Sequence, residues 1–308
     1  LLDLLDSPAR DGINGIATKL RAARLAFGAL WPAWAKLIAA ERLRASMLMA
    51  NAHEVEPGAV ARAYRGALER LAAAHGVSEI RAAGRAGLKL LDAVPADGVH
   101  RPRVVAVGEI YVMMASYANR GAVKGLLGQE AVEVVEGISV SKFIRHSASE
   151  IVRRVAAGVW PVRPVRDRLA RINIHLLPQR LRDARSCPFL CREVGGEGVP
   201  SVAAARRAIE GGAVDGIVHV HPFKCMPEAI GKDALKEMAE VYGVRYLALT
   251  FDRETEIERL RTEVGTFAAV LAASPPARLC PGERRRRRRI GRNLDRAFAA
   301  AAAGKHTS

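Results

Sequence analysis

A short apolar run that ends in one proline and leads to a second constrains this chain more than any other feature. Ile217, Val218 and Val220 form a run typical of a buried strand in a parallel sheet. Pro222 lacks the N–H that a sheet ladder requires, so the strand is expected to end there. Pro227 suits the first turn of a helix, where its missing N–H is no loss. The stretch therefore predicts a strand, a turn and then a helix.

Cys225 lies between the end of this strand and the start of this helix. Open α/β sheets bind ligands at the carboxyl ends of their strands. The N-terminus of a helix, together with neighbouring Lys224, is expected to favour the thiolate form. A cysteine at this point can ligate a metal or act as a nucleophile. A free cysteine is also commonly a small buried hydrophobe, and the local sequence leaves both interpretations open.

The pattern between residues 101 and 275 predicts an α/β domain. Apolar runs typical of strands occur at 103–107, 133–135 and 246–250. Patterns typical of helices occur at 119–127, 141–157, 201–210, 227–242 and 254–273. Half of the residues are hydrophobic and only 5% are aromatic, and this composition favours helices and parallel strands over a β-sandwich.

Residues 1–100 are expected to form a helical region. Residues 16–50 are rich in Ala, Leu and Arg, which are good helix formers, and Pro32 is expected to break or kink their helix. Two further helices are predicted at 57–76 and 78–94. A basic amphipathic helix also occurs at membrane surfaces, but an ordinary packed helix needs the same apolar stripe and is the favoured interpretation.

Composition bounds the setting of the chain. No run of about 18 uncharged apolar residues occurs, so no membrane span is expected. The four cysteines are irregularly spaced, which fits a reducing, cytoplasmic setting better than a disulfide framework. The chain begins with Leu1 and shows no signal segment. We therefore expect its N-terminus to be truncated relative to a full gene product.

Two acidic residues occupy the same kind of position as Cys225. Glu109 and Asp252 each follow a predicted strand, where α/β proteins bind ligands; a surface carboxylate is the alternative interpretation of Glu109. The glycine-rich stretch at 195–198 carries neither a P-loop nor a Rossmann fingerprint, so it predicts a turn. The chain itself is therefore not expected to be an ATPase.

Four ordered stretches carry a family resemblance. They are a Gly-Glu-Ile-Tyr-Val segment at 108–112 followed by Asn119, a Gly-Gly-x-Gly turn at 195–198 followed by Ser-Val, a Pro-Phe-x-Cys-Met-Pro segment at 222–227, and an ending at 249–267 with Asp252, Thr255, Arg261 and Phe267. Together they resemble proteins related to 2-hydroxyacyl-CoA dehydratases and their activators, the CoA-enzyme activases. The resemblance covers roughly residues 60–272.

The resemblance implies a Rossmann- or flavodoxin-like parallel-sheet domain and an iron–sulfur protein. It implies a 4Fe–4S cluster with Cys225 as a metal ligand, and Glu109 and Asp252 as cofactor-binding residues. A separate ATP-hydrolysing activator protein would drive a low-potential electron to the cluster, for radical reduction or dehydration of an acyl-CoA-type substrate. The chain is also expected to form a homodimer or a heterodimer. Whether the chain itself is an enzyme stays open.

One departure from the family pattern concerns the other cluster ligands. The family's first lobe normally carries a Cys-Gly-Pro-Cys-like turn, which this chain lacks. A cluster usually has three or four cysteine ligands, so the rest must come from Cys187 and Cys191, a partner chain or a missing lobe. Cys187 and Cys191 form a Cys-x-x-x-Cys pair in a proline-rich stretch, and two incidental loop cysteines are the favoured interpretation of it.

Residues 276–308 are expected to form a disordered basic tail. Arginine fills every position from 284 to 289, and residues 278–308 carry a net charge of +8, half of the chain's +16. Such a run binds polyanions whatever fold precedes it. The alternative function is therefore a non-enzymatic α/β lobe whose basic arm binds nucleic acid or an acidic partner. A solvated tail is the favoured interpretation, and nucleic acid is expected as a partner only through this arm.

Overall fold

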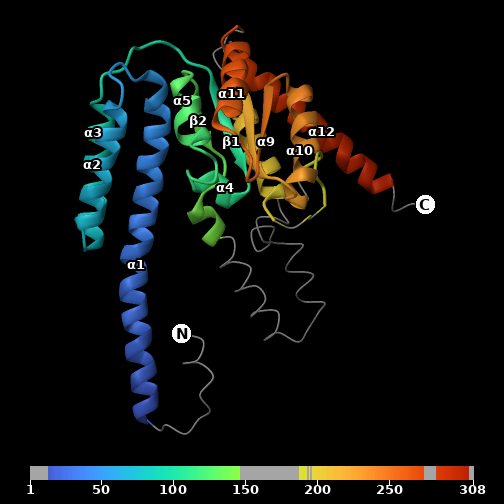
Figure 1. Cartoon of the computed structure of the whole chain (residues 1–308). Helices are drawn as coiled ribbons and strands as arrows, with labels where there is room; N and C mark the ends of the chain where they lie inside the picture. Colours follow the sequence, from blue (N-terminus) through green and yellow to red (C-terminus); the bar gives the residue numbers. More distant parts are fainter. Residues whose placement is uncertain (1–12, 146–186, 193, 195, 274–281, 305–308) are drawn as a thin grey trace. The chain divides into compact units, whose positions relative to one another are not determined.

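A computed structural model of the chain describes residues 13–145, 187–192, 194, 196–273 and 282–304. The chain divides into two compact units (Figure 1). The first unit comprises the residues up to Ser46 together with Gly58–Val94. The second unit comprises Met47–Pro57 and the chain from Pro95 onward. The helical N-terminal region and the α/β domain predicted from the sequence are thus both confirmed.

Helices make up the first unit: most of α1 (Ile13–Ala50), then α2 (Ala59–Ala73) and α3 (Val77–Asp92). Small residues let these helices approach closely, because a Cβ on Gly87 would lie 2.8 Å from side-chain atoms of both Leu43 and Ala67. Of the break or kink expected at Pro32, the break does not occur, since α1 continues through this residue. Proline removes one backbone hydrogen bond at a cost of about 3 kcal/mol, and a helix of 38 residues retains many others.

Among the residues that the structure describes, no helix has both the length and the apolar character needed to cross a membrane.

A parallel sheet organises the second unit. Its described strands are β1 (Arg103–Gly108), β2 (Glu133–Glu136), β3 (Gly216–Pro222) and β4 (Arg245–Phe251). Their order is β2-β1-β3-β4, and every neighbouring pair is parallel. This order is the flavodoxin-like one, in which the chain reverses its direction of winding between β1 and β3. Ligands of such sheets bind outside the carboxyl ends of the strands at this switch point.

Helices cover both faces of the sheet (Figure 1). On one face Ile217 belongs to an apolar cluster with residues of α9 (Gly198–Glu210) and α10 (Met226–Tyr242). On the other face Gly216 lies against Phe267 and Leu271 of α11 (Ile257–Ala272). Neighbouring residues of a strand point to opposite faces, which explains why both Gly216 and Ile217 are buried.

Short helical segments connect β1 to β2. They are α4 (Ile110–Met114), the π-helical turn η2 (Ala122–Leu126) and α5 (Leu127–Gln129). Elsewhere in the chain, a 3-10 turn, η1 (Asn51–His53), follows α1. The helix predicted at 119–127 is thus divided into a turn and short helical pieces. Of the helix predicted at 141–157, residues 141–145 are helical, and the remainder lies outside the described residues.

The basic C-terminal segment forms a helix, α12 (Glu283–Gly304). Ile290 and Leu294 of this helix pack against the apolar cluster beneath α9 and α10. Arg287 is fully buried and donates from Nη1 to the carbonyl oxygen of Val214 at 2.6 Å. The prediction of a disordered tail is therefore wrong for these residues. Forming the helix buries apolar and polar groups that were expected to be exposed to solvent.

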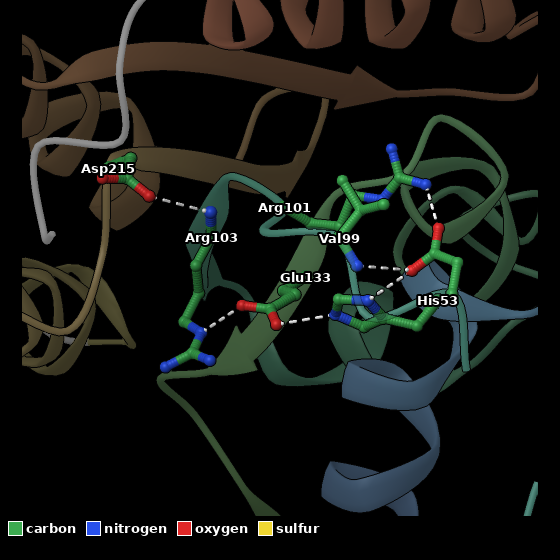
Figure 2. Close-up of polar contacts among 7 residues, drawn as sticks. His53, Val99, Arg101, Arg103, Glu133 and Asp215 are labelled. Atoms are coloured by element: carbon green, nitrogen blue, oxygen red, sulfur yellow. Dashed lines mark hydrogen bonds and ion pairs between the residues drawn. The ribbon is translucent and has the colours of Figure 1, made fainter. Parts of the chain in front are cut away.

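The amino ends of the strands carry a polar cluster around His53 (Figure 2). His53 Nε2 lies 2.9 Å from Glu133 Oε1, and Nδ1 lies 3.2 Å from Asp97 Oδ1. Glu133 also accepts a hydrogen bond from Arg103 Nε at 2.6 Å. The backbone N–H of Arg103 donates to Asp215 at 3.0 Å. These contacts tie the segment Met47–Pro57, which precedes α2, to the first residues of β1 and β2.

Candidate functional site at the sheet switch point

The switch point between β1 and β3 brings Glu109 against the end of β3. The backbone N–H of Glu109 donates to the carbonyl oxygen of Val220 at 3.1 Å. Gly108 has φ +141°, and a Cβ on it would lie 1.8 Å from the same Val220 oxygen. A side chain at residue 108 is therefore excluded, since this conformation and this approach both require glycine.

The carboxylate of Glu109 caps α4. Its Oε2 accepts a hydrogen bond from the backbone N–H of Val112 at 2.9 Å, as an N-cap side chain does. The buried side chain of Asn119 then fixes the far end of this segment, because its Nδ2 donates to the carbonyl oxygen of Val112 at 2.6 Å and its Oδ1 accepts from Gly121. The segment containing Glu109 is thus held in place by its own hydrogen bonds.

Cys225 is the N-cap residue of α10 and is partly buried. Burial is the main cause that raises the pKa of its thiol, and the carboxylates of Glu228, Glu109 and Glu197 raise it further. The backbone N–H of Glu228 opposes this shift only in part. The expectation of a thiolate favoured by the helix N-terminus is therefore wrong in direction. Lys224 was also expected to favour the thiolate, but its side chain is exposed and its ammonium group lies over the ring of Phe223.

The glycine-rich stretch before α9 brings a third acidic residue to this edge. A Cβ on Gly198 would lie 2.4 Å from the carbonyl oxygen of Pro227, and one on Gly196, whose φ is +48°, would lie 2.8 Å from the Pro227 ring. These glycines therefore allow the N-terminus of α9 to lie against the first turn of α10. Between them lies Glu197, one of the carboxylates that act on Cys225.

Asp252 also lies at this edge, directly after β4, but its carboxylate is used locally. Its Oδ1 accepts hydrogen bonds from the hydroxyl of Thr255 at 2.7 Å and from the backbone N–H of Glu254 at 3.0 Å. The hydroxyl of Thr255 is the main cause that lowers the pKa of Asp252. The structure thus brings Glu109 close enough to act on Cys225, whereas Asp252 orders the turn that leads to α11.

The structure describes two further cysteines, and neither shares the surroundings of Cys225. Cys187 is buried in the apolar cluster beneath α9 and α10, and Cys191 is exposed. Cys280 lies outside the described residues. Within the described part of the chain, no group of three or more His, Cys, Asp and Glu side chains is arranged to hold a metal ion. The described residues therefore provide one cysteine at this edge, fewer than the three or four thiolates of a typical iron–sulfur site.

A buried polar network lies directly beneath Cys225, and the sequence analysis missed it. His219 Nε2 lies 2.6 Å from Glu228 Oε2, and both side chains are fully buried. The hydroxyl of Ser201 donates to the other carboxylate oxygen at 3.2 Å, and His219 Nδ1 lies 3.1 Å from the hydroxyl of Tyr246. Both ring nitrogens of His219 and both carboxylate oxygens of Glu228 thus have hydrogen-bond partners. The network joins β3, β4, α9 and α10 at the base of the site.

His221 extends the polar face of β3 toward the carboxyl edge. Its ring lies 4.7 Å from that of His219, and its Nε2 lies 3.2 Å from the hydroxyl of Thr250. Burial is the main cause that lowers the pKa of His221. A sequence signal for this network existed, because histidines at alternate positions of a buried strand point to one face, where each polar group needs a partner.

Comparison with models of known protein families gave no match, and a search of curated proteins found no significant similarity. The resemblance to CoA-enzyme activases and 2-hydroxyacyl-CoA dehydratase components therefore stays a prediction from the four sequence motifs.

Proposed function

We propose that this chain is an α/β lobe related to 2-hydroxyacyl-CoA dehydratase components and CoA-enzyme activases, and that Cys225 provides one ligand of an iron–sulfur cluster shared with another lobe or chain. When bound, such a cluster receives a low-potential electron, driven by an ATP-hydrolysing partner, for radical reduction or dehydration of an acyl-CoA-type substrate. The chain's own contribution is a single thiol on a rigid edge of the sheet.

The observation that carries the proposal is the convergence of the four resembling stretches. The first ends β1 and begins α4, the second begins α9, the third joins β3 to α10, and the fourth runs from the end of β4 into α11. Three of them are in contact or act electrostatically on one another, through Glu109, Glu197, Pro227 and Cys225. Motifs that are far apart in the sequence and meet at the switch point of a parallel sheet are typical of a ligand site.

The fit between the residues and a cluster is partial. Cys225 is accessible from solvent, and its backbone is fixed on one side by β3 and on the other by α10. The thiol must lose its proton to bind metal, and the surrounding carboxylates make that loss harder. A complete site therefore requires thiolates from outside the described residues, which is why the proposal assigns this chain one ligand.

Anaerobic reconstitution with iron, sulfide and an excess of a small thiol tests the proposal, because the small thiol can supply the ligands that the chain does not. We expect bound iron and sulfide, with broad absorbance near ~400 nm, in the wild type and in the matched control Cys191→Ser. Cys225→Ser should lose both. Full iron and sulfide content in Cys225→Ser, or none in the wild type, would overturn the assignment.

A further inference from the structure

The basic helix α12 is anchored to the sheet unit through one of its faces. Ile290 and Leu294 pack on the apolar cluster, and Arg287 is buried beside them. Gly291 lies so close to α9 that a Cβ on it would be 2.1 Å from a carboxylate oxygen of Glu210. These positions recur every three or four residues, so they lie along one side of the helix.

Polar contacts fix the rotation of α12 about its axis. Asp295 accepts hydrogen bonds from Arg206 of α9 at 2.8 and 2.9 Å. At the start of the helix, Glu283 accepts from Arg286 and Arg287, and these guanidinium groups lower the pKa of Glu283 to about 2. The arginine row therefore divides into side chains that hold the helix in place and side chains that do not.

Two members of the second group, Arg285 and Arg289, form a stripe opposite the anchored face together with Arg292 and Arg296, which follow the row. Arg285, Arg289, Arg292 and Arg296 are spaced by four, three and four residues, and all are exposed. At 3.6 residues per turn they fall within an arc of about 60° and extend over about 16 Å of helix. Among the residues that the structure describes, none of these four guanidinium groups has a hydrogen-bonded or ion-paired partner.

This stripe has no role in holding the fold together. Like charges three or four residues apart on a helix destabilise it by about 0.2–0.5 kcal/mol per pair. Arg285 also lies in the first turn, where the positive end of the helix dipole disfavours a cation. An anion placed along the stripe would reverse both effects.

We propose that the stripe Arg285, Arg289, Arg292 and Arg296 binds the phosphate backbone of duplex nucleic acid without base preference. A duplex carries one charge per ~1.7 Å, so a stripe of this length faces on the order of ten phosphates. Guanidinium groups bind phosphate oxygens through paired hydrogen bonds. The proposal is independent of the function suggested for the sheet edge, because it uses none of the same residues.

An anionic membrane and an acidic protein are the two other candidate partners, and both fit the stripe less well than nucleic acid does. A helix that binds an anionic membrane presents an apolar face beside its basic one, but Ile290 and Leu294 are already packed on the sheet unit. Among the described residues of α12, none is an exposed large hydrophobic side chain. Hot spots of protein interfaces are aromatic or arginine side chains that become fully desolvated in well-packed pockets, whereas the stripe consists of exposed arginines with no aromatic residue among them. Phosphate recognition requires none.

Fluorescence anisotropy with the full chain and a labelled DNA duplex of mixed sequence tests the proposal. If four phosphates are neutralised, the logarithm of affinity falls with the logarithm of salt with a slope of about −3.6, and affinity drops about 150-fold between about 50 and 200 mM salt. Changing all four stripe arginines to Gln should remove this binding. Circular dichroism should show no loss of fold, because the four side chains are exposed.

The matched control changes four exposed arginines of α2 and α3 to Gln and lowers the net charge equally: Arg65, Arg70, Arg81 and Arg85. It should keep both the affinity and the salt slope. Equal loss in the control would show that net charge alone causes binding and would overturn the proposal. So would a wild type that does not bind the duplex, or one that binds vesicles containing anionic lipid as tightly as it binds DNA.

Discussion

Removal of the Glu228 carboxylate tests whether the buried network beneath Cys225 holds the site in place. Glu228 is fully buried and accepts hydrogen bonds from His219 and Ser201. Glu228→Ala leaves two buried donors without an acceptor, at about 1–3 kcal/mol each. It also loses a buried methylene worth about 0.8 kcal/mol. We expect a loss of about 3–7 kcal/mol in the free energy of unfolding, a large part of the ~5–15 kcal/mol of a typical domain.

Urea denaturation followed by circular dichroism measures this loss, with Glu237→Ala as the control. Glu237 is exposed on the same helix, so its replacement should change the free energy of unfolding by no more than about 0.5 kcal/mol. A double variant, Glu228→Leu with His219→Phe, should lose less stability than the sum of the single changes, since it leaves no charged or hydrogen-bonding group of the pair unpaired. If Glu228→Ala and Glu237→Ala are equally stable, the network does not support the site.

Three further predictions concern positions whose contacts differ from the sequence-based expectation or were missed by it. Burial and nearby carboxylates raise the pKa of Cys225, and the thiolate is the reactive form. The rate of its alkylation by iodoacetamide, measured as a function of pH, should therefore reach half of its maximum at a pH above the ordinary pKa of cysteine. A midpoint below the ordinary pKa would show that the carboxylates and burial do not disfavour the thiolate. His53→Ala removes a ring held between two carboxylates and should lower the free energy of unfolding by about 1–3 kcal/mol in urea denaturation, whereas an unchanged midpoint would show that this cluster contributes nothing. Truncation before Glu283 removes the buried Arg287 and its apolar neighbours, so the thermal midpoint should fall by several degrees, and an unchanged midpoint would restore the interpretation of a solvated tail.

The sheet domain was largely predictable because its boundaries are set by local chemistry. The strand predicted at 246–250 is Arg245–Phe251, and the helix predicted at 227–242 is Met226–Tyr242. Gly243 ends that helix in the left-handed conformation, as glycine at such a position commonly does. At Pro32 the local preference against helix does not interrupt α1, because the long helix on both sides of it outweighs that preference.

The candidate site was predictable in position but not in chemistry. Glu109, Cys225 and Asp252 follow parallel strands, so the sequence alone indicates that they share one edge of the sheet. The direction of the Cys225 pKa shift depends on Glu109 and Glu197, which reach it only after residues far apart in the sequence are packed together. The hydrogen-bond partners of Asp252 are by contrast within three residues of it. An aspartate that accepts from the backbone two residues on is a common turn motif, so this local role was predictable from the sequence.

The C-terminal helix was missed because its anchored face contains few of the residues that usually mark a core. Ile290 and Leu294 are its apolar contacts, and the rest of that face is formed by Gly291 and the buried part of Arg287. A count of apolar residues in 278–293 finds too little to offset the loss of chain entropy. Once the helical period is drawn through residues 283, 287, 290 and 294, however, a continuous contact face appears. The same period places Arg285, Arg289, Arg292 and Arg296 together on the opposite side, where all four are exposed and can face the anion proposed above.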